Sequence, residues 1–236
     1  MINSVRNTVL AIVNKQNFGY ITPNDFNLYA KQAQLDIFED VFYRYNQWVS
    51  IINSKRQGNE KAATDYADII KNIEEVIDTF SVYTPLAQDT NSVFDIPNDY
   101  YLLNKVYYNN NREIERVSNG RIIHLLSSNL TSPTVTYPAY VLNGSKITVY
   151  PTTITSNVST QYIRKPKDPK WTYSQLGAGE PIFNQSQPDY QDFELPKAYE
   201  PELVVKILQY SGISIRENEV YNFSKAEESF KDQKQG

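Results

Sequence analysis

The longest run of apolar residues with helical spacing begins at Pro23 and continues to about Asn53. Thr22 is a favourable N-cap residue, Pro23 is favoured at the first helical position, and Asp25 completes a capping box. At 1.5 Å per residue, a helix of this length would be about 45 Å long. The pattern therefore predicts a long helix with a well-defined start.

Apolar residues occupy more than one side of this predicted helix. Its main stripe follows spacings of three and four and consists of Phe26, Tyr29, Ala30, Ala33, Ile37, Val41, Tyr45, Trp48 and Ile52. A second strip falls outside that stripe and consists of Leu28, Leu35, Phe38 and Phe42. We interpret the main stripe as part of the protein's own core. We expect the second strip to be more apolar surface than one small domain can cover.

Two further helical patterns flank the long one. The N-terminal segment has one buried helix face, formed by Val5, Val9, Ile12 and Val13. After a polar turn, a narrow apolar seam recurs at Ala63, Tyr66, Ile70, Ile73, Ile77 and Phe80. Such a seam predicts a third helix that packs back on the long one as an α-hairpin.

The chain returns to helical periodicity near its C-terminal end. Pro201 starts a segment whose apolar face is formed by Leu203, Val204, Ile207 and Leu208. Gly212 is predicted to cap that helix. Ser214 and Glu217 form a capping box for a last, charged helix through Phe230. We expect these helices to pack on the N-terminal ones.

The middle of the chain is rich in Tyr, Val and Thr, and alternation replaces the helical period. The segments on either side of residues 109–111 predict an antiparallel pair of strands. Asn143-Gly144 predicts a hairpin with a type I′ turn. Residues 119–130 fit either a hairpin turn or a short helix, and the spacing of their Ile and Leu residues favours the helix. A further strand is expected over residues 159–166.

Together these patterns predict an α+β protein. A helical bundle, made of a long α-hairpin and C-terminal helices, would carry an inserted antiparallel β domain and an extended Pro-rich arm. The expected boundaries are residues 1–80 for the N-terminal helices, 81–165 for the β insert, 166–200 for the arm and 201–236 for the C-terminal helices.

Composition narrows the class of protein. The chain has 236 residues, of which 40% are hydrophobic and 19 are Tyr, so we expect it to fold. It has no Cys, which excludes disulfides, a thiolate nucleophile and a sulfur-ligated metal, and which fits a reducing cytosol. The net charge is -4 and the Lys and Arg residues are scattered, which argues against tight binding to duplex DNA. We find no signal-peptide pattern, and no apolar run near the roughly 20 residues of a membrane span.

Candidate catalytic groups are few. His124 is the only imidazole, and no G-x-S-x-G stretch accompanies it, which favours a structural role. The carboxylates of the third helix are interpreted as a solvated face: Asp65, Asp68, Glu74, Glu75 and Asp78. The stretch 177–180 lacks the Lys of a phosphate-binding loop. We therefore predict no catalytic, cofactor-binding or metal-binding residues, and no enzymatic activity.

Three stretches of the sequence share one resemblance. They are VRNTVLAIVNKQNFGYITPNDFNLYAKQAQLDIFE, then VYPTTI with QYIRKPKDPKW, and finally FELPKAYEPELVVKILQYSGISIRENEV. Together they resemble the virion structural proteins of crAss-like podophages, in particular the first ring protein of the neck, and the likeness covers most of the chain. The helix element is carried by Pro23, Phe26, Asn27, Ala30, Ala33 and Gln34. The arm element is carried by Tyr162, Arg164, Lys165, Pro166 and Trp171.

The resemblance implies a head-to-tail connector, an adaptor ring of about twelve copies below the portal that surrounds the DNA channel. It implies contacts with the portal protein and with other neck and tail ring proteins, passage of DNA without sequence-specific binding during ejection, and no membrane partner. The protein would be made in the bacterial host cytoplasm and reside in the virion. In such a ring the second strip of the long helix would face the next copy. The arm would clamp a neighbour or an adjoining ring, and the C-terminal helices would meet the portal.

Other functions remain open. One is a different virion component, such as a lower ring, a tail-hub or a cargo protein. Another is a glycan-binding or glycan-hydrolysing module in which Trp171 and Tyr173 stack on a sugar, although Tyr is also typical of protein interfaces. A glycan module predicts a stable monomer with an activity, whereas a ring protein predicts self-association.

Overall fold

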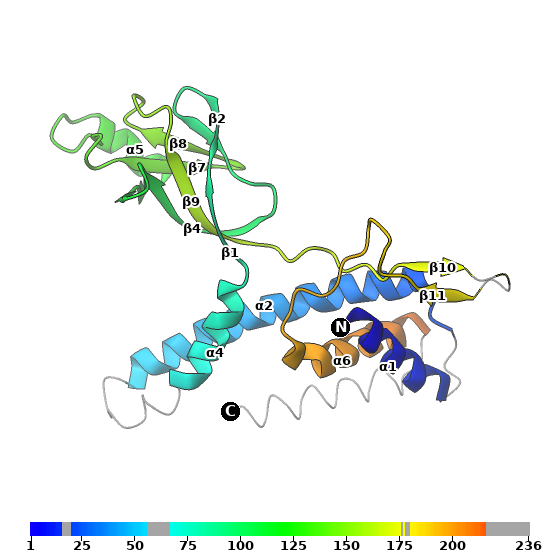
Figure 1. Cartoon of the computed structure of the whole chain (residues 1–236). Coiled ribbons are helices and arrows are strands. Elements are labelled where there is room, and N and C mark those ends of the chain that lie inside the picture. Colours follow the sequence, from blue (N-terminus) through cyan, green and yellow to red (C-terminus); the bar gives the residue numbers. More distant parts are fainter. Residues whose placement is uncertain (16–19, 56–66, 176, 178–179, 216–236) are drawn as a thin grey trace. The chain divides into compact units, whose positions relative to one another are not determined.

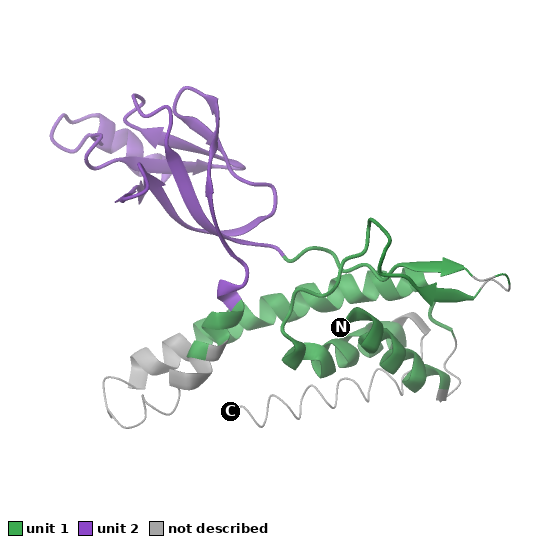
Figure 2. Ribbon diagram, viewed as in Figure 1, with its two compact units in different colours: residues 1–76, 166–236 green, residues 77–165 purple. Residues whose placement is uncertain are grey.

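The computed structural model of the chain describes residues 1–15, 20–55, 67–175, 177 and 180–215 (Figure 1). Helices and strands are both abundant, which confirms the α+β class. The chain divides into two compact units (Figure 2). Residues 77–165 form the β unit, which includes the segment for which the sequence predicts a β insert, and the residues on either side of it form the helical unit.

The helical unit contains α1 (Ile2–Lys15), α2 (Pro23–Lys55), most of α4 (Ala67–Asp78) and α6 (Glu200–Ile215). A short 3-10 turn, η1 (Lys197–Tyr199), leads into α6. The described residues of 166–195 precede this turn, and we call them the strap. They are largely extended and contain one short antiparallel hairpin, β10 (Tyr173–Gln175) with β11 (Pro181–Phe183).

Helix α2 begins at the residue that the capping signals predict. The Asp25 N–H donates to Thr22 Oγ1 at 3.2 Å, and the Thr22 hydroxyl donates to the Asp25 carboxylate at 2.6 Å. The Phe26 N–H donates to the Thr22 carbonyl at 2.9 Å, the first backbone bond of the helix. This cap fixes where α2 starts and therefore which of its residues share a face.

Helix α6 packs on both α1 and α2. It lies antiparallel to α2, because Glu202 contacts Arg44 at 3.4 Å, whereas Lys206, one turn later in α6, contacts Asp40, one turn earlier in α2, at 3.6 Å. The apolar faces of the three helices supply the core: Ile2, Val5, Val9, Val13, Phe26, Ala30, Ala33, Ile37, Val41, Leu203, Val204, Ile207 and Leu208 are buried. The main-stripe residues Phe26, Ala30, Ala33, Ile37 and Val41 of α2 thus belong to this core.

We expected the second strip of α2 to be more apolar surface than one small domain can cover. This expectation is wrong, because most of the strip is buried or half-buried. Phe38 is only 1% exposed, Leu35 is half-buried, and the half-buried Phe42 contacts Phe38 edge-on at 4.9 Å between ring centroids. Only Leu28 is largely open, at 64%. The chain itself therefore covers Phe38.

The predicted end of the C-terminal helix is also wrong. Helix α6 continues through Gly212, which is buried, to Ile215. A helical Gly costs about 1 kcal/mol relative to Ala, a cost that tertiary packing readily offsets. Ser214 accordingly lies inside α6 and does not open a new helix. Glu217 and the last predicted helix through Phe230 lie outside the described residues.

Helix α4 corresponds to the later part of the predicted third helix. Its seam residues Ile73 and Ile77 are half-buried. The Tyr45 hydroxyl of α2 donates to Glu74 Oε1 at 3.2 Å, which links the two helices. The earlier seam positions, Ala63 and Tyr66, lie outside the described residues.

The β unit consists of two sheets. One has the order β1-β9-β4-β5 and the other has the order β2-β3-β8-β7-β6. The first contains β1 (Ser81–Pro85), β9 (Val158–Arg164), β4 (Tyr100–Tyr108) and β5 (Arg112–Glu113). The second contains β2 (Ala87–Thr90), β3 (Val93–Asp95), β8 (Lys146–Tyr150), β7 (Ala139–Asn143) and β6 (Glu115–Arg116). The first and last strands, β1 and β9, pair antiparallel with Ser81 opposite Ile163.

Both sheets share one core and are joined at their sides. The core is formed by Leu86, Phe94, Ile96, Leu103, Val106, Ile114, Tyr140, Ile147, Val149, Ile154, Val158 and Tyr162. Leu86 separates β1 from β2, and Ile114 separates β5 from β6, so at each of these buried residues the chain passes from one sheet to the other. The predicted strand after residue 111 is therefore split: its first part pairs with β4, but Glu115–Arg116 pairs parallel with β7.

The hairpin at Asn143-Gly144 forms with a different turn from the one predicted. Asn143 pairs with Lys146, so the two central residues are Gly144 and Ser145. Gly144 has φ of 61° and is the residue of the turn with a positive φ. A positive φ at the first central position alone is the pattern of a type II′ turn, which favours Gly there.

The ambiguous segment after residue 118 forms the favoured helix, α5 (Asn119–Leu126). Ser118 caps it by accepting from the Arg121 N–H at 3.4 Å. Ile122 packs with Val117, Ala139 and Val141 in a small second cluster. This cluster fixes α5 against strand β7 of the five-stranded sheet.

Candidate interaction sites

Asn27 and Gln34 of the helix element and Trp171 of the arm element lie in one joint of the helical unit, whereas Tyr162, Arg164 and Lys165 of the arm element belong to the β unit. Asn27 and Gln34 are seven residues apart on α2, two helical turns, so their side chains project from the same face. Both bind backbone atoms of the strap. Ala30 lies between them and is fully buried, and its small side chain permits the close approach of an extended chain. We call this contact the strap joint.

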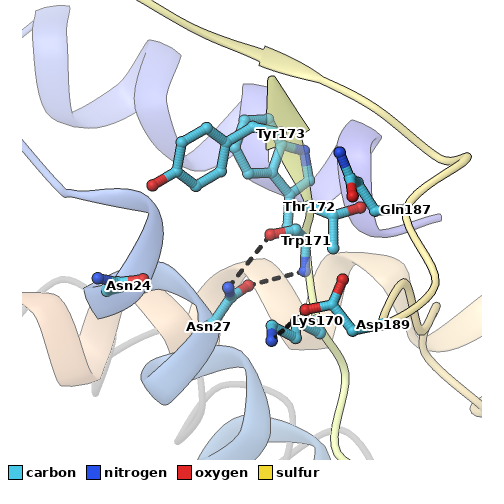
Figure 3. Close-up of a pocket in the computed structure, with 8 residues that line it drawn as sticks. All are labelled: Asn24, Asn27, Lys170, Trp171, Thr172, Tyr173, Gln187 and Asp189. Carbon is cyan, nitrogen blue, oxygen red and sulfur yellow. Dashed lines mark hydrogen bonds and ion pairs between the residues drawn. The ribbon is translucent and has the colours of Figure 1, made fainter. Parts of the chain in front are cut away.

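The Asn27 amide binds Trp171 at two points. Its Oδ1 accepts from the Trp171 N–H at 2.8 Å, and its Nδ2 donates to the Trp171 carbonyl at 3.2 Å (Figure 3). One side chain thus satisfies both backbone groups of a residue in the strap, as a neighbouring strand would.

Gln34 joins two passages of the strap. Its Nε2 donates to the Lys167 carbonyl at 2.8 Å, and its Oε1 accepts from the Glu194 N–H at 2.9 Å. The Lys167 N–H in turn donates to the Glu194 carboxylate at 2.7 Å. Gln34 is only 1% exposed, so its own amide depends on these two backbone partners for hydrogen bonds that water cannot easily replace.

Trp171 is the apolar anchor of the strap and is 1% exposed. The Arg6 guanidinium lies 3.8 Å from its ring centroid, and Tyr173 and Phe183 stack on it at 5.6 and 5.9 Å. Its Nε1 donates to Asn3 Oδ1 at 3.0 Å. The ring of Trp171 is thus packed against side chains of its own unit, which argues against its stacking on a sugar.

Arg6 is an unusual component of this joint because it is a cation that is 6% exposed. Burial lowers the pKa of its guanidinium. Its Nε has no hydrogen-bond partner within the described part of the chain. The face of Trp171 provides the attraction that a cation receives from an aromatic quadrupole, which partly offsets the loss of water.

Asp192 ties the strap to the start of α1. Its carboxylate accepts from the Ile2 N–H at 2.7 Å, from the Phe193 N–H at 2.8 Å and from the Met1 ammonium at 2.9 Å. Burial opposes the charged form, but these hydrogen bonds outweigh it and lower the pKa of Asp192. Asp192 therefore caps α1 from a position far along the chain.

A pocket of about 290 Å³ lies beside the joint and is lined by Asn24, Asn27, Lys170, Trp171, Thr172, Tyr173, Gln187 and Asp189 (Figure 3). Its charged groups, Lys170 and Asp189, are paired at 2.5 Å. The Asn27 amide is occupied by Trp171 on both sides, and Thr172 Oγ1 donates to the Asn184 carbonyl. The pocket lining thus has no nucleophile paired with a base.

The remaining candidate groups are dispersed. His124 is exposed on α5 of the β unit, where its carbonyl accepts from Ser127 Oγ at 2.7 Å. Glu74, Glu75 and Asp78 are exposed on α4, as a solvated face requires. Asp65 and the Asp68 side chain lie outside the described residues. Among the residues that are described, no three His, Cys, Asp or Glu side chains cluster to hold a metal ion.

A second notable surface lies on the β unit, at α5 and the loop after it. Five large apolar side chains are exposed there: Ile123, Leu126, Leu130, Val135 and Tyr137. We call this set the α5 surface. Sequence periodicity assigned Leu126 and Leu130 to one helix face, but α5 ends at Leu126 and Leu130 lies in the loop, 95% exposed. The sequence contained a usable signal, because residues 122–138 have no charged side chain except that of His124 when protonated.

No protein-family model matches the sequence, and comparison with curated proteins finds no significant match. Of the helices that the structure describes, none is both long enough and apolar enough to cross a membrane. The described residues thus offer one buried, hydrogen-bonded joint and one open apolar surface as the main candidates for a role.

Proposed function

We propose that the protein is a phage virion structural protein, a head-to-tail connector that forms an adaptor ring of about twelve copies below the portal. The ring would surround the DNA channel and contact the portal and other neck and tail ring proteins. The proposal starts from the sequence resemblance to neck proteins of crAss-like podophages. Physical support comes from the distribution of exposed apolar side chains.

The observation that carries the proposal is that both units expose large apolar side chains. The helical unit exposes Tyr20, Leu28, Tyr43 and Ile182, and the β unit exposes the five side chains of the α5 surface. A subunit of a closed ring meets one neighbour through one surface and the other neighbour through a different surface. Exposed apolar side chains on two separate units suit such heterologous contacts.

The strap joint changes the role proposed for the arm. Backbone groups of the strap bind Asn27 and Gln34 of α2, the strap residue Asp192 binds the start of α1, and Trp171 is buried. The strap is therefore bound within its own unit, and a contact with a neighbouring copy would use its exposed side chains, such as Ile182. We propose instead that the strap stiffens α2, so that each copy presents a rigid helical wedge to the ring.

In the proposed ring, DNA passes through the channel without sequence-specific binding. Lys and Arg are spread over both units, and the net charge of -4 provides no strong attraction for phosphates. A mildly acidic subunit suits a channel wall along which DNA must slide.

The test is the mass of the purified full chain over a range of concentrations, alone and with the portal protein. We expect self-association into rings or assembly that depends on the portal, seen directly by electron microscopy. A protein that stays monomeric under both conditions would contradict the proposal. Cleavage of a polysaccharide by that monomer would favour the glycan module instead.

A further inference from the structure

The α5 surface has the features of a preorganised docking surface. We propose that it docks on the helical unit of a neighbouring copy of this chain. The inference rests on the proposed ring and states which unit of a neighbouring copy the α5 surface contacts in it. It is carried by the shape, the anchoring and the charge of residues 117–138.

The loop after α5 is held in place by its own hydrogen bonds. Thr131 Oγ1 donates to the Leu125 carbonyl at 3.2 Å, and the Arg112 guanidinium donates to the Val135 carbonyl at 3.1 Å. The Thr134 N–H and the Tyr137 carbonyl are bonded at 3.1 Å. A loop that is ordered while Leu130 remains 95% exposed loses little conformational entropy when a partner covers it.

Helix α5 cannot turn this apolar side inward. Ile122, which lies about 100° from Ile123 around the helix, is already buried with Val117, Ala139 and Val141. Burying Ile123 instead would expose Ile122, so the β unit gains nothing by rotating the helix. The apolar side chains therefore need cover from outside the β unit.

The terminal strands of both sheets are short, with 5 residues in β1, 4 in β2 and 2 each in β5 and β6. Short edges discourage the addition of a partner strand. Strand β4 is longer, and β5 pairs with it only at Tyr107 and Tyr108, so β5 covers only part of its outer edge. Docking through the apolar side chains of the α5 surface does not depend on these edges.

The distribution of charge favours the helical unit of a neighbouring copy as the partner of the α5 surface. Residues 117–138 contain one Arg, Arg121, and no Asp or Glu. The β unit as a whole has seven Lys or Arg and six Asp or Glu, whereas the helical unit has sixteen and twenty-one. Two α5 surfaces facing each other would bring Arg121 against its own copy. The acidic helical unit of a neighbour gives apolar contact together with opposite charge, and the resulting head-to-tail contact can close into a ring.

The absence of Cys allows a direct test. In the full-length protein, Leu130→Cys is labelled with a thiol-reactive benzophenone and irradiated, and the cross-linked dimers are isolated and digested for mass spectrometry. We expect adducts in residues 1–76 or 166–215 of the second copy. Adducts confined to a second β unit, or no cross-linked dimer at all, would overturn the inference. Leu102→Cys, on strand β4 of the same unit, is the matched control and should give at least fivefold less cross-linked dimer.

A charge placed on the surface separates this inference from the proposed function. Leu130→Asp and Tyr137→Asp should each weaken self-association at least tenfold, whereas Leu102→Asp should not. If the two variants form rings as readily as the unaltered protein, the docking inference fails and the connector proposal stands. If the unaltered protein forms no assembly with or without the portal, both fail.

Discussion

The strap joint and the α5 surface both contain large aromatic or apolar side chains, but these side chains are buried in the joint and exposed on the α5 surface. At the joint, the aromatic ring of Trp171 is 1% exposed and the polar groups of Asn27 and Gln34 are matched to backbone partners. At the α5 surface, the ring of Tyr137 is 80% exposed and Leu130 is almost fully open. A joint whose aromatic anchor is buried and whose Asn27 and Gln34 amides are paired within one chain serves the stability of that chain. A rigid surface whose apolar groups remain open serves an association.

The largest effect should come from truncating the anchor of the joint. Trp171→Ala should lower the free energy of unfolding by about 3–5 kcal/mol, because it leaves a cavity among Arg6, Tyr173 and Phe183. Urea denaturation measures this change. Tyr137→Ala, the corresponding change in the α5 surface, should cost about 0.5 kcal/mol or less. Equal losses in the two variants would erase the distinction between the regions.

Removal of one amide should come next. Gln34→Ala strands the Lys167 carbonyl and the Glu194 N–H, and should cost about 2–3 kcal/mol. Gln32→Ala is the control, since Gln32 is an exposed residue of the same helix, and its expected cost is about 0.5 kcal/mol or less. Hydrogen exchange of the Glu194 amide should rise in the first variant alone. Unchanged exchange there would mean that Gln34 does not hold the strap.

Acid should weaken the strap through Asp192. The folded pKa of this carboxyl is below its unfolded value near 3.9, so its contribution is fully present above that value and is lost as the pH falls through the folded pKa. The stability difference between the unaltered protein and Asp192→Asn, measured by denaturation from pH 7 to pH 2, should therefore be constant above about pH 5 and shrink below it. A difference that grows toward acid would reverse the assigned sign.

The smallest change in stability should come from Leu130. At concentrations where the protein is monomeric by mass, Leu130→Asp should alter the free energy of unfolding by no more than about 0.5 kcal/mol. Leu103→Asp places the same charge in the buried core of the same unit and should unfold it. A large loss of monomer stability in Leu130→Asp would show that the α5 surface belongs to the fold.

Local signals in the sequence predicted local structure well. The cap of α2 depends on Thr22 and Asp25, which are three residues apart, and the favoured helix after Ser118 depends on spacing within one short segment. The turn at Gly144 was missed by one position because cross-strand register, rather than the dipeptide alone, sets its central residues. The continuation of α6 through Gly212 was missed because packing decides it.

Contacts between distant segments could not be predicted from one sequence. Asn27 and Trp171 are 144 residues apart, and periodicity alone cannot assign the polar side chain of one to the backbone of the other. The resemblance to neck proteins included both Asn27 and Trp171, but it did not show that these two residues contact each other. The burial of Phe38 was missed for a similar cause, since helical periodicity shows where an apolar side chain lies on the helix but not what covers it.

The pairing of Ser81 with Ile163 brings the two ends of the β unit beside each other. A domain whose entry and exit lie on adjacent strands behaves as a cassette that can be lengthened, shortened or exchanged without pulling apart the chain that hosts it. Evolution can thus vary what residues 77–165 display to other proteins while the host helices keep their own chemistry.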